Sequence, residues 1–185
     1  NSLKSEKELK ENINKHLLNK YEENLRQIEK KQLMDALDVN NNFEVPEGII
    51  DEEFNLIWHK VEHAKKNNTL DKDDAKLSTV KLKKRYERIA SRRVKLAILM
   101  EYIANEQKIT VSENELKEGM LNYASQYPGQ EKKILDYFKQ NTSSIESVRG
   151  TILEKKIVDF ILSKTKQNIK KISLKDFNKL QKDTF

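Results

Sequence analysis

Two histidines that lie four residues apart, His59 and His63, are the first candidates for chemistry in this 185-residue chain. On a helix, this spacing places both imidazoles on one face, where they could share one metal ion. A zinc site also needs a third ligand and partners that orient the rings, and Glu62 does not stand where the metalloprotease motif requires its glutamate. We therefore interpret the pair as exposed helix surface and predict no metal site.

A cluster of carboxylates follows at Asp71, Asp73 and Asp74. A calcium loop would need glycine at its sixth position and glutamate at its twelfth, and this segment has neither. We interpret it as a helix cap or solvated turn, within a stretch at residues 69–79 that we expect to be a charged loop or a short helix. The chain has no cysteine and only four glycines, and it shows no phosphate-binding loop, nucleophile elbow or serine–histidine–acid constellation. We predict no catalytic residue and no cofactor.

A basic stretch lies between positions 81 and 95. Its members are Lys81, Lys83, Lys84, Arg85, Arg88, Arg92, Arg93 and Lys95. Such a density could neutralise several phosphates of a nucleic acid. At 3.6 residues per turn, however, these side chains spread around a helix, and aromatic side chains that would stack on bases are almost absent among them. We favour a solvated helix with ion pairs, and a nucleic-acid-binding helical module is the alternative.

Aromatic side chains gather around a turn signal at Pro128 and Gly129. Tyr123, Tyr127, Tyr137 and Phe138 fall within sixteen residues there. Two interpretations are open. These rings could pack a helical hairpin together, because aromatic side chains usually fill cores. Because two such short helices cannot enclose all four rings, the rings could instead form an exposed apolar patch that binds another polypeptide.

The elements that must position these residues are expected to be helices. Four glycines and two prolines leave little material for the tight turns of a β-protein. The net charge of +6 arises from 36 basic and 30 acidic residues that are intermixed along the chain, so there is no polycationic tail. No apolar run approaches the roughly 18 residues of a membrane span, and no membrane partner is expected. We predict a soluble all-α protein.

Apolar residues spaced three and four apart predict a first helix from about Ser5 to Asp38. Such a helix would be roughly 50 Å long, whereas a compact chain of this size has a radius of gyration of about 16 Å, so the domain should be elongated. Three asparagines at 40–42 break this helix. An extended segment then leads to Pro46, where a second helix begins that fades at Lys65.

A central helix is predicted from about Leu82 onward, because apolar residues form two adjacent stripes there. The first contains Leu82, Tyr86, Ile89, Leu96, Met100 and Ile103, with Arg93 in the place of one member, and the second contains Ala90, Val94, Ala97 and Ala104. Two stripes indicate that helices before and after it in the chain both pack against it. Capping-box spacing at Ser112 and at Ser143 predicts that two later helices begin at these residues. A last short helix is expected at residues 174–180.

Several segments resemble, in order and at similar spacing, the carboxy-terminal domain of bacterial trigger factors. The most specific is residues 88–104, RIASRRVKLAILMEYIA, in which a paired arginine precedes a long apolar stretch and a glutamate. Residues 45–53, VPEGIIDEE, are similar to the family's Val-Pro, apolar pair and acidic run. Residues 109–115, the aromatic segments within 124–138 and the helix at 149–161 also fit. Together these segments cover nearly the whole chain.

This resemblance implies that residues 1–185 form an all-helical, elongated body with two projecting helical arms, a fold similar to that of periplasmic chaperones. It implies a cytoplasmic, ATP-independent chaperone domain that holds nascent or unfolded polypeptides through dispersed apolar contacts. The parent protein would bind the ribosome through an amino-terminal domain, isomerise prolyl bonds through another domain, and act in the folding and export of new proteins. Neither of those domains is in these residues, so no enzyme activity is expected here, and homodimer formation is left open.

The family's apolar second-arm face corresponds to five residues of this sequence. They are Tyr123, Tyr127, Ile134, Tyr137 and Phe138, and we predict that they contact clients. The presumed first-arm tip, residues 65–78, is strongly polar, with Leu70 and Leu77 as its apolar members. The second arm is therefore the stronger candidate for client binding. A periplasmic chaperone core and a plain oligomerisation domain remain alternatives.

Overall fold

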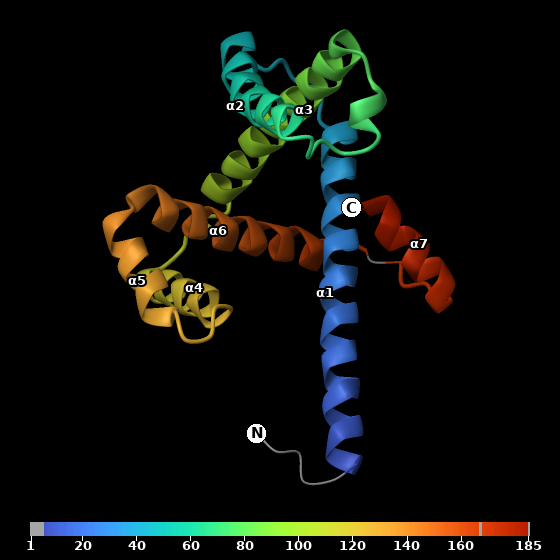
Figure 1. Cartoon of the computed structure of the whole chain (residues 1–185), viewed down its shortest axis with the longest axis vertical. Coiled ribbons are helices and arrows are strands. Elements are labelled where there is room, and N and C mark those ends of the chain that lie inside the picture. Colours follow the sequence, from blue (N-terminus) through green and yellow to red (C-terminus); the bar gives the residue numbers. More distant parts are fainter. Residues whose placement is uncertain (1–5, 167, 185) are drawn as a thin grey trace. The chain divides into compact units, whose positions relative to one another are not determined.

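The computed structural model describes residues 6–166 and 168–184, and every regular element in these two ranges is helical (Figure 1). In chain order, the elements are α1 (Glu6–Asn40), α2 (Glu47–Lys66), a short 3-10 helix η1 (Asp74–Lys76), α3 (Thr79–Glu106), α4 (Glu113–Ser125), α5 (Glu131–Gln140), α6 (Thr142–Lys164) and α7 (Leu174–Thr184). The predicted all-α fold is confirmed. The chain divides into two compact units, Asn1–Asn40 with Thr165–Phe185 and Asn41–Lys164.

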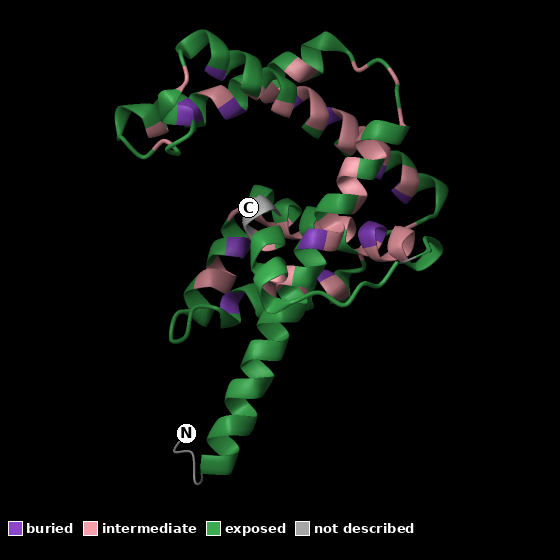
Figure 2. Cartoon of the chain, turned by 90° about the vertical axis from the view of Figure 1, so that its right-hand side faces the viewer, coloured by how far each residue is buried: buried purple, intermediate pink, exposed green. Residues whose placement is uncertain are grey.

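The first unit contains α1 and α7, which pack against each other. The rings of Tyr21 and Phe177 meet edge to face in this contact, with their centroids 5.5 Å apart. The expected helix start at Ser5 lies outside the described residues, and α1 ends at Asn40, where the predicted asparagine break begins. Most of the apolar stripe of α1 is exposed, and Ile28 is the one buried residue of this helix (Figure 2).

In the second unit, α2 and α3 share an apolar core. α2 begins directly after Pro46, as the sequence predicts. Ile57 and Val61 of α2 pack with Leu82 and Ala90 of α3. Partly buried side chains surround this cluster, namely Ile50, Phe54, Trp58, Leu70, Leu77, Tyr86 and Ile89. The three- and four-residue spacing on both helices explains the contact, because it places these side chains on stripes that can face each other.

The segment between α2 and α3 is a turn that packs on this core. The Asp71 carboxylate accepts a hydrogen bond from the N–H of Asp73 at 2.9 Å, and the Asp71 carbonyl accepts one from the N–H of Ala75 at 2.8 Å. The 3-10 helix η1 follows. Asp74 in this helix is only 4% exposed, so the prediction of a solvated turn is wrong for Asp74 and correct for its two aspartate neighbours.

α3 is the central helix of the second unit, because both α2 and α6 contact it. Its buried residues are Leu82, Ala90, Val94, Met100 and Ala104. Arg93, which interrupts one of the two predicted stripes, points to the surface, and its guanidinium pairs with the Glu53 carboxylate at 2.8 Å. The prediction that helices before and after α3 pack on it is confirmed.

The last three helices of this unit, α4, α5 and α6, pack against one another. The capping box predicted at Ser112 is present: its hydroxyl accepts from the N–H of Glu115, and the Glu115 carboxylate accepts from the N–H of Ser112. α4 ends at Ser125, and the turn to α5 contains Gly129 with a φ of 82°, a value that glycine adopts without strain.

The helix start predicted at Ser143 is wrong. α6 begins at Thr142, and the carbonyl of Asn141 accepts the first helical hydrogen bonds, from the N–H groups of Ser144 and Ile145. Asn141 thus takes the N-cap position. Its side-chain amide donates to the carbonyl of Tyr137 on α5 at 3.0 Å, so Asn141 joins the end of α5 to the start of α6.

Candidate polypeptide-binding groove

A groove of about 650 Å³ lies among α4, α5 and α6, and we call it the α4–α6 groove. The residues that line it are Gly119, Asn122, Tyr123, Gln126, Ile134, Tyr137, Phe138, Ser144, Ser147, Val148, Thr151 and Ile152. Four of the five residues predicted to contact clients are among them. None of the lining residues is charged, although charged residues make up 36% of the chain.

Tyr123 and Tyr137 present ring surface beside the groove. They are 44% and 54% exposed, respectively. Both rings contact Phe138, with centroid distances of 5.6 Å from Tyr123 and 6.4 Å from Tyr137. Such edge contacts hold a ring in place without burying it. α4 and α5 therefore present two tyrosine rings in a defined orientation.

Phe138 itself is only 4% exposed, and Ile134 is half-buried one turn earlier on α5. The Phe138 ring packs against Tyr123 of α4, so it holds the two helices together and forms part of the floor of the groove. Phe138 therefore packs in the core, as the first interpretation of the aromatic group requires, and the three tyrosines are exposed, as the second requires. That they bind another polypeptide stays a prediction.

Tyr127 lies beside the groove and is not one of its lining residues. It is exposed, and its ring centroid is 5.6 Å from that of Tyr123. A hydrogen bond between the two hydroxyls is the main reason why the pKa of Tyr123 is raised above its usual value. Tyr127 thus extends the aromatic surface toward the turn between α4 and α5.

The opposite wall of the groove comes from α6 and depends on Gly119 of α4. A Cβ atom at Gly119 would lie 2.7 Å from Cδ1 of Ile152 and 3.2 Å from Cγ1 of Val148. Contacts this short do not occur without a shift, so glycine permits the close approach of α4 and α6. Sequence reasoning missed this wall, although Val148 and Ile152 lie four residues apart on one helical face and could have indicated it.

Ion pairs fix the start of α4 against α6. The Lys156 ammonium lies 2.6 Å from the Glu115 carboxylate and donates to the carbonyl of Thr110 at 2.7 Å. The pKa of Glu115 is lowered to about 2, mainly because its carboxylate accepts a hydrogen bond from Lys156. The hydrogen bonds with Ser112 in the capping box lower this pKa further. Arg149 of α6 donates to the carbonyl of Val111 at 3.3 Å. These contacts hold two walls of the groove in register.

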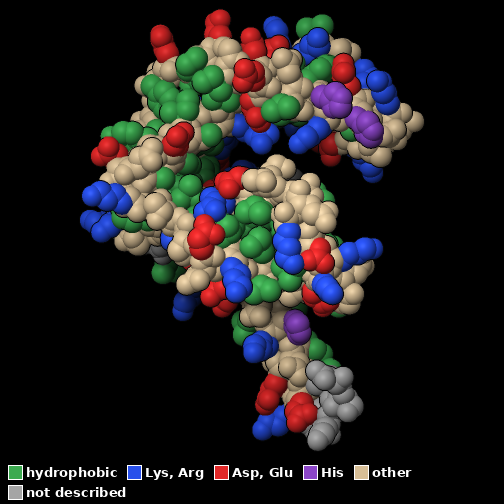
Figure 3. Space-filling view, turned by 90° about the vertical axis from the view of Figure 1, so that its left-hand side faces the viewer, with side chains coloured by type: hydrophobic (Ala, Val, Ile, Leu, Met, Phe, Trp, Pro, Cys, Tyr) green, Lys and Arg blue, Asp and Glu red, His purple; other side chains and the backbone are tan. Residues whose placement is uncertain are grey.

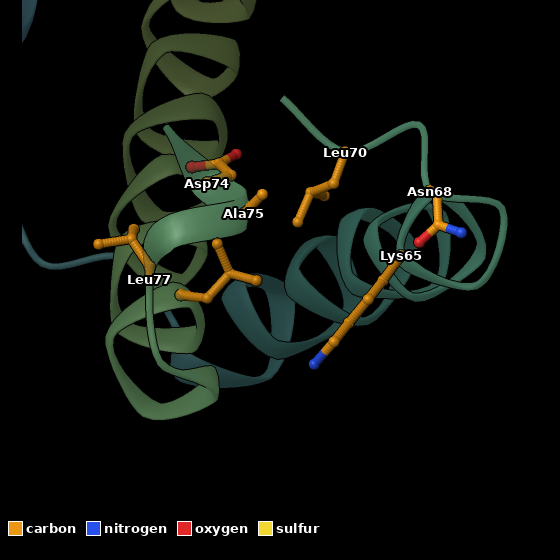
Figure 4. A pocket seen from close by; sticks show the side chains of 7 residues that line it. Lys65, Asn68, Leu70, Asp74, Ala75 and Leu77 are labelled. Carbon is orange, nitrogen blue, oxygen red and sulfur yellow. The ribbon is translucent and has the colours of Figure 1, made fainter. Parts of the chain in front are cut away.

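A smaller pocket of about 260 Å³ lies between the end of α2 and the turn before α3. Its lining residues are Lys65, Asn68, Leu70, Asp74, Ala75, Leu77 and Leu82. Figure 4 shows the Lys65 ammonium and the Asp74 carboxylate at opposite ends of this pocket. Leu70 and Leu77, the apolar members of the presumed first-arm tip, are partly buried against the α2–α3 core. They pack this helix pair and offer little free apolar surface.

The predicted histidine pair lies on α2 and is exposed, and the ring of His63 contacts the Asn67 side chain. Among the side chains that the structure describes, no three from histidine, cysteine or acidic residues are grouped closely enough to hold a metal ion. In the basic stretch, the Arg85 guanidinium forms an ion pair with the Asp74 carboxylate at 3.1 Å. The Lys83 ammonium lies over the Trp58 ring, 5.3 Å from its centroid. These contacts agree with an ion-paired helix surface.

On the face shown in Figure 3, hydrophobic side chains reach the surface in several separate groups among charged ones. No helix among the described residues is long and apolar enough to cross a membrane. The apolar surface on the face in Figure 3 is therefore dispersed.

Comparison with known proteins gives a consistent result. Residues 6–163 match the family model described as "Bacterial trigger factor protein (TF) C-terminus". The chain is 39% identical over 176 residues to a trigger factor from Granulibacter bethesdensis, covering 95% of this chain and 40% of that protein.

Two further relatives are similar. A trigger factor from Bartonella tribocorum is 34% identical over 182 residues, which are 98% of this chain and 38% of the relative. One from Gluconobacter oxydans is 44% identical over 133 residues, which are 72% of this chain and 30% of the relative. The chain thus spans at most about two fifths of the length of these relatives.

Proposed function

The chain belongs to the family of bacterial trigger factor carboxy-terminal domains, and from this premise we propose that it is an ATP-independent chaperone domain that holds nascent or unfolded polypeptides. The observation that supports this most is the uncharged α4–α6 groove, which carries four of the five residues expected to contact clients. An unfolded chain exposes apolar side chains, and the half-exposed tyrosine rings beside the groove offer them a surface.

Binding would rest on many weak apolar contacts. Each Å² of apolar surface removed from water contributes about 25 cal/mol, so burying about 50 Å² of one ring gives ~1 kcal/mol, or about fivefold in affinity. No single contact then holds a client tightly. Release is spontaneous, and the charged surface around the groove keeps the complex in solution.

The parent protein is proposed to act in the cytoplasm, where an amino-terminal domain would bind the ribosome and a separate domain would isomerise prolyl bonds. The domain described here would hold the emerging chain during folding or export. It has no proposed catalytic residue and needs no cofactor. Residues 1–185 would form one functional part of that protein, with homodimer formation as a further proposal.

The test is suppression of aggregation of a chemically unfolded model protein by this chain. We expect the double variant Tyr123→Ser with Tyr137→Ser to need at least about fivefold more protein for the same suppression, because it lacks two exposed rings. Phe138 is unsuited to this test, since it is buried and its replacement would disturb the contact between α4 and α5.

The matched control is Tyr102→Ser. Tyr102 is a tyrosine on α3 that is 62% exposed and does not line the groove. Circular dichroism verifies that all variants stay helical. Equal suppression by the wild type and the double variant would contradict the proposed role of the groove, and no suppression by the wild type at severalfold excess would contradict the chaperone function itself.

A further inference from the structure

The helix α5 is attached to its neighbours in a different way from α4 and α6. The start of α4 is fixed to α6 by polar contacts, in which Lys156 pairs with Glu115 and Arg149 donates to the carbonyl of Val111. Among the described residues, no side chain of α5 forms a hydrogen bond or an ion pair with α4 or α6. Apart from the chain connections at its two ends, α5 is therefore held by packing contacts alone.

Phe138 makes the central packing contact of α5. It is the one buried residue of this helix, and its ring meets the edge of the Tyr123 ring on α4 with the centroids 5.6 Å apart. Ile134 and Leu135 are half-buried beside it. Apolar packing has no preferred direction, so it opposes a rotation of α5 less than a set of directed hydrogen bonds would.

Both ends of α5 have the form of a pivot. Asn141 is the single residue between α5 and α6, and its φ of −131° and ψ of 89° are not helical. At the other end, residues 126–130 join α4 to α5 and contain Gly129 with a φ of 82°. The N-cap residue Gln130 makes no side-chain capping bond. Hinges in proteins are a few such residues at the ends of elements, which absorb changes in φ and ψ.

We propose that α5 is a hinged lid of the α4–α6 groove, which opens by rotation about its two ends when the Phe138 ring leaves Tyr123. α5 contributes Ile134, Tyr137 and Phe138 to the lining of the groove. Its rotation widens the groove while the polar contacts between α4 and α6 keep the other two walls in register. This inference rests on the proposed chaperone function and concerns how the site adapts to clients of different bulk.

Opening also changes how much apolar surface the groove presents. In the closed form Phe138 is only 4% exposed, and the open form brings its ring to the surface beside the tyrosines. Exposing this ring to water is unfavourable, so the chain without a client is mainly closed. An unfolded client that covers the ring binds the open form more tightly and shifts the population toward it.

Distances between two spin labels measure this movement in the whole chain. The chain has no cysteine, so labels can be attached to introduced ones. The lid pair is Glu118→Cys on α4 with Lys133→Cys on α5, and the wall pair is Glu118→Cys with Lys155→Cys on α6. All three positions are exposed and lie outside the groove lining. Double electron–electron resonance records each pair with and without a permanently unfolded model protein.

We expect the lid pair to show a second, longer distance, whose share rises at least about threefold when the unfolded protein is added, because the client selects the open form. The wall pair should keep one distance under both conditions. A lid pair with one unchanged distance overturns the proposal. A wall pair that changes as much as the lid pair overturns it as well, since the three helices would then separate together.

A variant tests the role of Phe138 in holding the lid closed. Phe138→Leu keeps an apolar side chain but removes the ring contact, so the share of the longer distance without client should rise about two- to tenfold. The matched control is Phe177→Leu, which removes a similar edge contact with Tyr21 in the other unit and should leave the lid pair unchanged. Equal shares in both variants contradict the role of Phe138. If Phe138→Leu loses helix content, the wild-type pairs decide alone.

The outcomes separate the lid from the proposed function. If aggregation suppression needs Tyr123 and Tyr137 but the lid pair never changes, the lid is wrong and the chaperone function stands. If the lid pair changes but suppression does not need the two tyrosines, the proposed role of the groove fails and the hinge remains. If the unfolded protein does not bind at all, the chaperone function fails, and the shift in Phe138→Leu tests the hinge by itself.

Discussion

Asp74 shows how a single residue can connect a loop to a helix. Its side chain is almost fully buried, and one carboxylate oxygen accepts a hydrogen bond of 2.6 Å from the Tyr86 hydroxyl. The other oxygen lies 3.1 Å from the Arg85 guanidinium, without hydrogen-bond geometry. Burial and the bond to Asp74 raise the pKa of Tyr86 to about 12. The turn before α3 is thus attached to α3 by a carboxylate that is isolated from water.

Removing the hydroxyl should therefore weaken the whole α2–α3 pair. We expect Tyr86→Phe to lower the free energy of unfolding by about 1 to 3 kcal/mol, because a buried carboxylate oxygen loses its only hydrogen-bond donor. Urea unfolding followed by circular dichroism measures the loss. Tyr102→Phe is the control, since Tyr102 is exposed and has no such bond, and an equal effect of both variants would contradict the role assigned to Tyr86.

At the residue scale, the sequence predicted the exposed polar residues better than the buried Asp74. The exposed histidines on α2 and the local turn at Asp71 follow from spacing and turn chemistry alone. The burial of Asp74 does not, because its partner Tyr86 lies twelve residues away and the apolar pattern assigned that tyrosine to a stripe. A hydroxyl that points from an apolar stripe to a carboxylate leaves no periodic signal.

Helix ends depend on signals that are local but can compete. Ser112 is followed by the glutamate of a capping box and has no equal competitor, so its prediction is confirmed. Before α6, the residues Asn141, Thr142, Ser143 and Ser144 are all good N-caps, and the sequence alone could not rank them. Asn141 is the C-cap residue of α5, and its carbonyl accepts the first hydrogen bonds of α6, so the second helix begins directly after the first.

The end of α3 carries a residue in an unfavourable conformation. Lys108 has a φ of 53°, and the N–H groups of Lys108 and Ile109 bond to the carbonyls of Asn105 and Ala104, a pattern that usually has glycine at this place. We expect Lys108→Gly to raise the free energy of unfolding by up to about 1 kcal/mol, because glycine has no Cβ atom and adopts this conformation without a steric clash. Thermal unfolding measures it, and a lowered midpoint would contradict the assignment.

The ion pair between α4 and α6 should make the stability of the second unit depend on acid. Because Lys156 and the capping box lower the pKa of Glu115 to about 2 in the folded chain, the pair stabilises fully above the unfolded pKa, near 4.3, and is lost as the pH falls toward 2. We expect Glu115→Gln to be less stable than the wild type at pH 7. The difference should shrink between about pH 4.5 and pH 2.

Urea unfolding at pH 7, 4 and 2 provides the measurement. Asp136→Asn is a matched control outside this contact, because the Asp136 carboxylate pairs only with Lys139 on its own helix. A difference between Glu115→Gln and the wild type that stays constant over this range would show that the ion pair does not contribute.

At the scale of the whole molecule, the order of the helices was predictable and the groove only in part. Spacing, capping and breaks define α1 to α7 locally, and the resemblance to trigger factors added which aromatic residues would matter. The α6 wall could not be placed, because it meets α4 through Gly119 and Ile152, which are 33 positions apart. Sequence periodicity tells which face of a helix is apolar, but it does not tell which other helix that face meets.

The charge of the whole chain leads to a last prediction, which separates client holding from nucleic-acid binding. The groove has no charged lining residue, so binding of a permanently unfolded, near-neutral model protein should change less than about twofold between 50 and 500 mM salt, as apolar contacts are not screened. Phosphate binding by the basic residues 81–95 would instead fall steeply, by a factor that grows with the number of phosphates engaged. Anisotropy titrations of the unfolded protein and of a labelled DNA duplex at the same salt concentrations compare the two. A client affinity that falls more than tenfold with salt would show that the charges on α3, and not the tyrosines of the groove, hold the client.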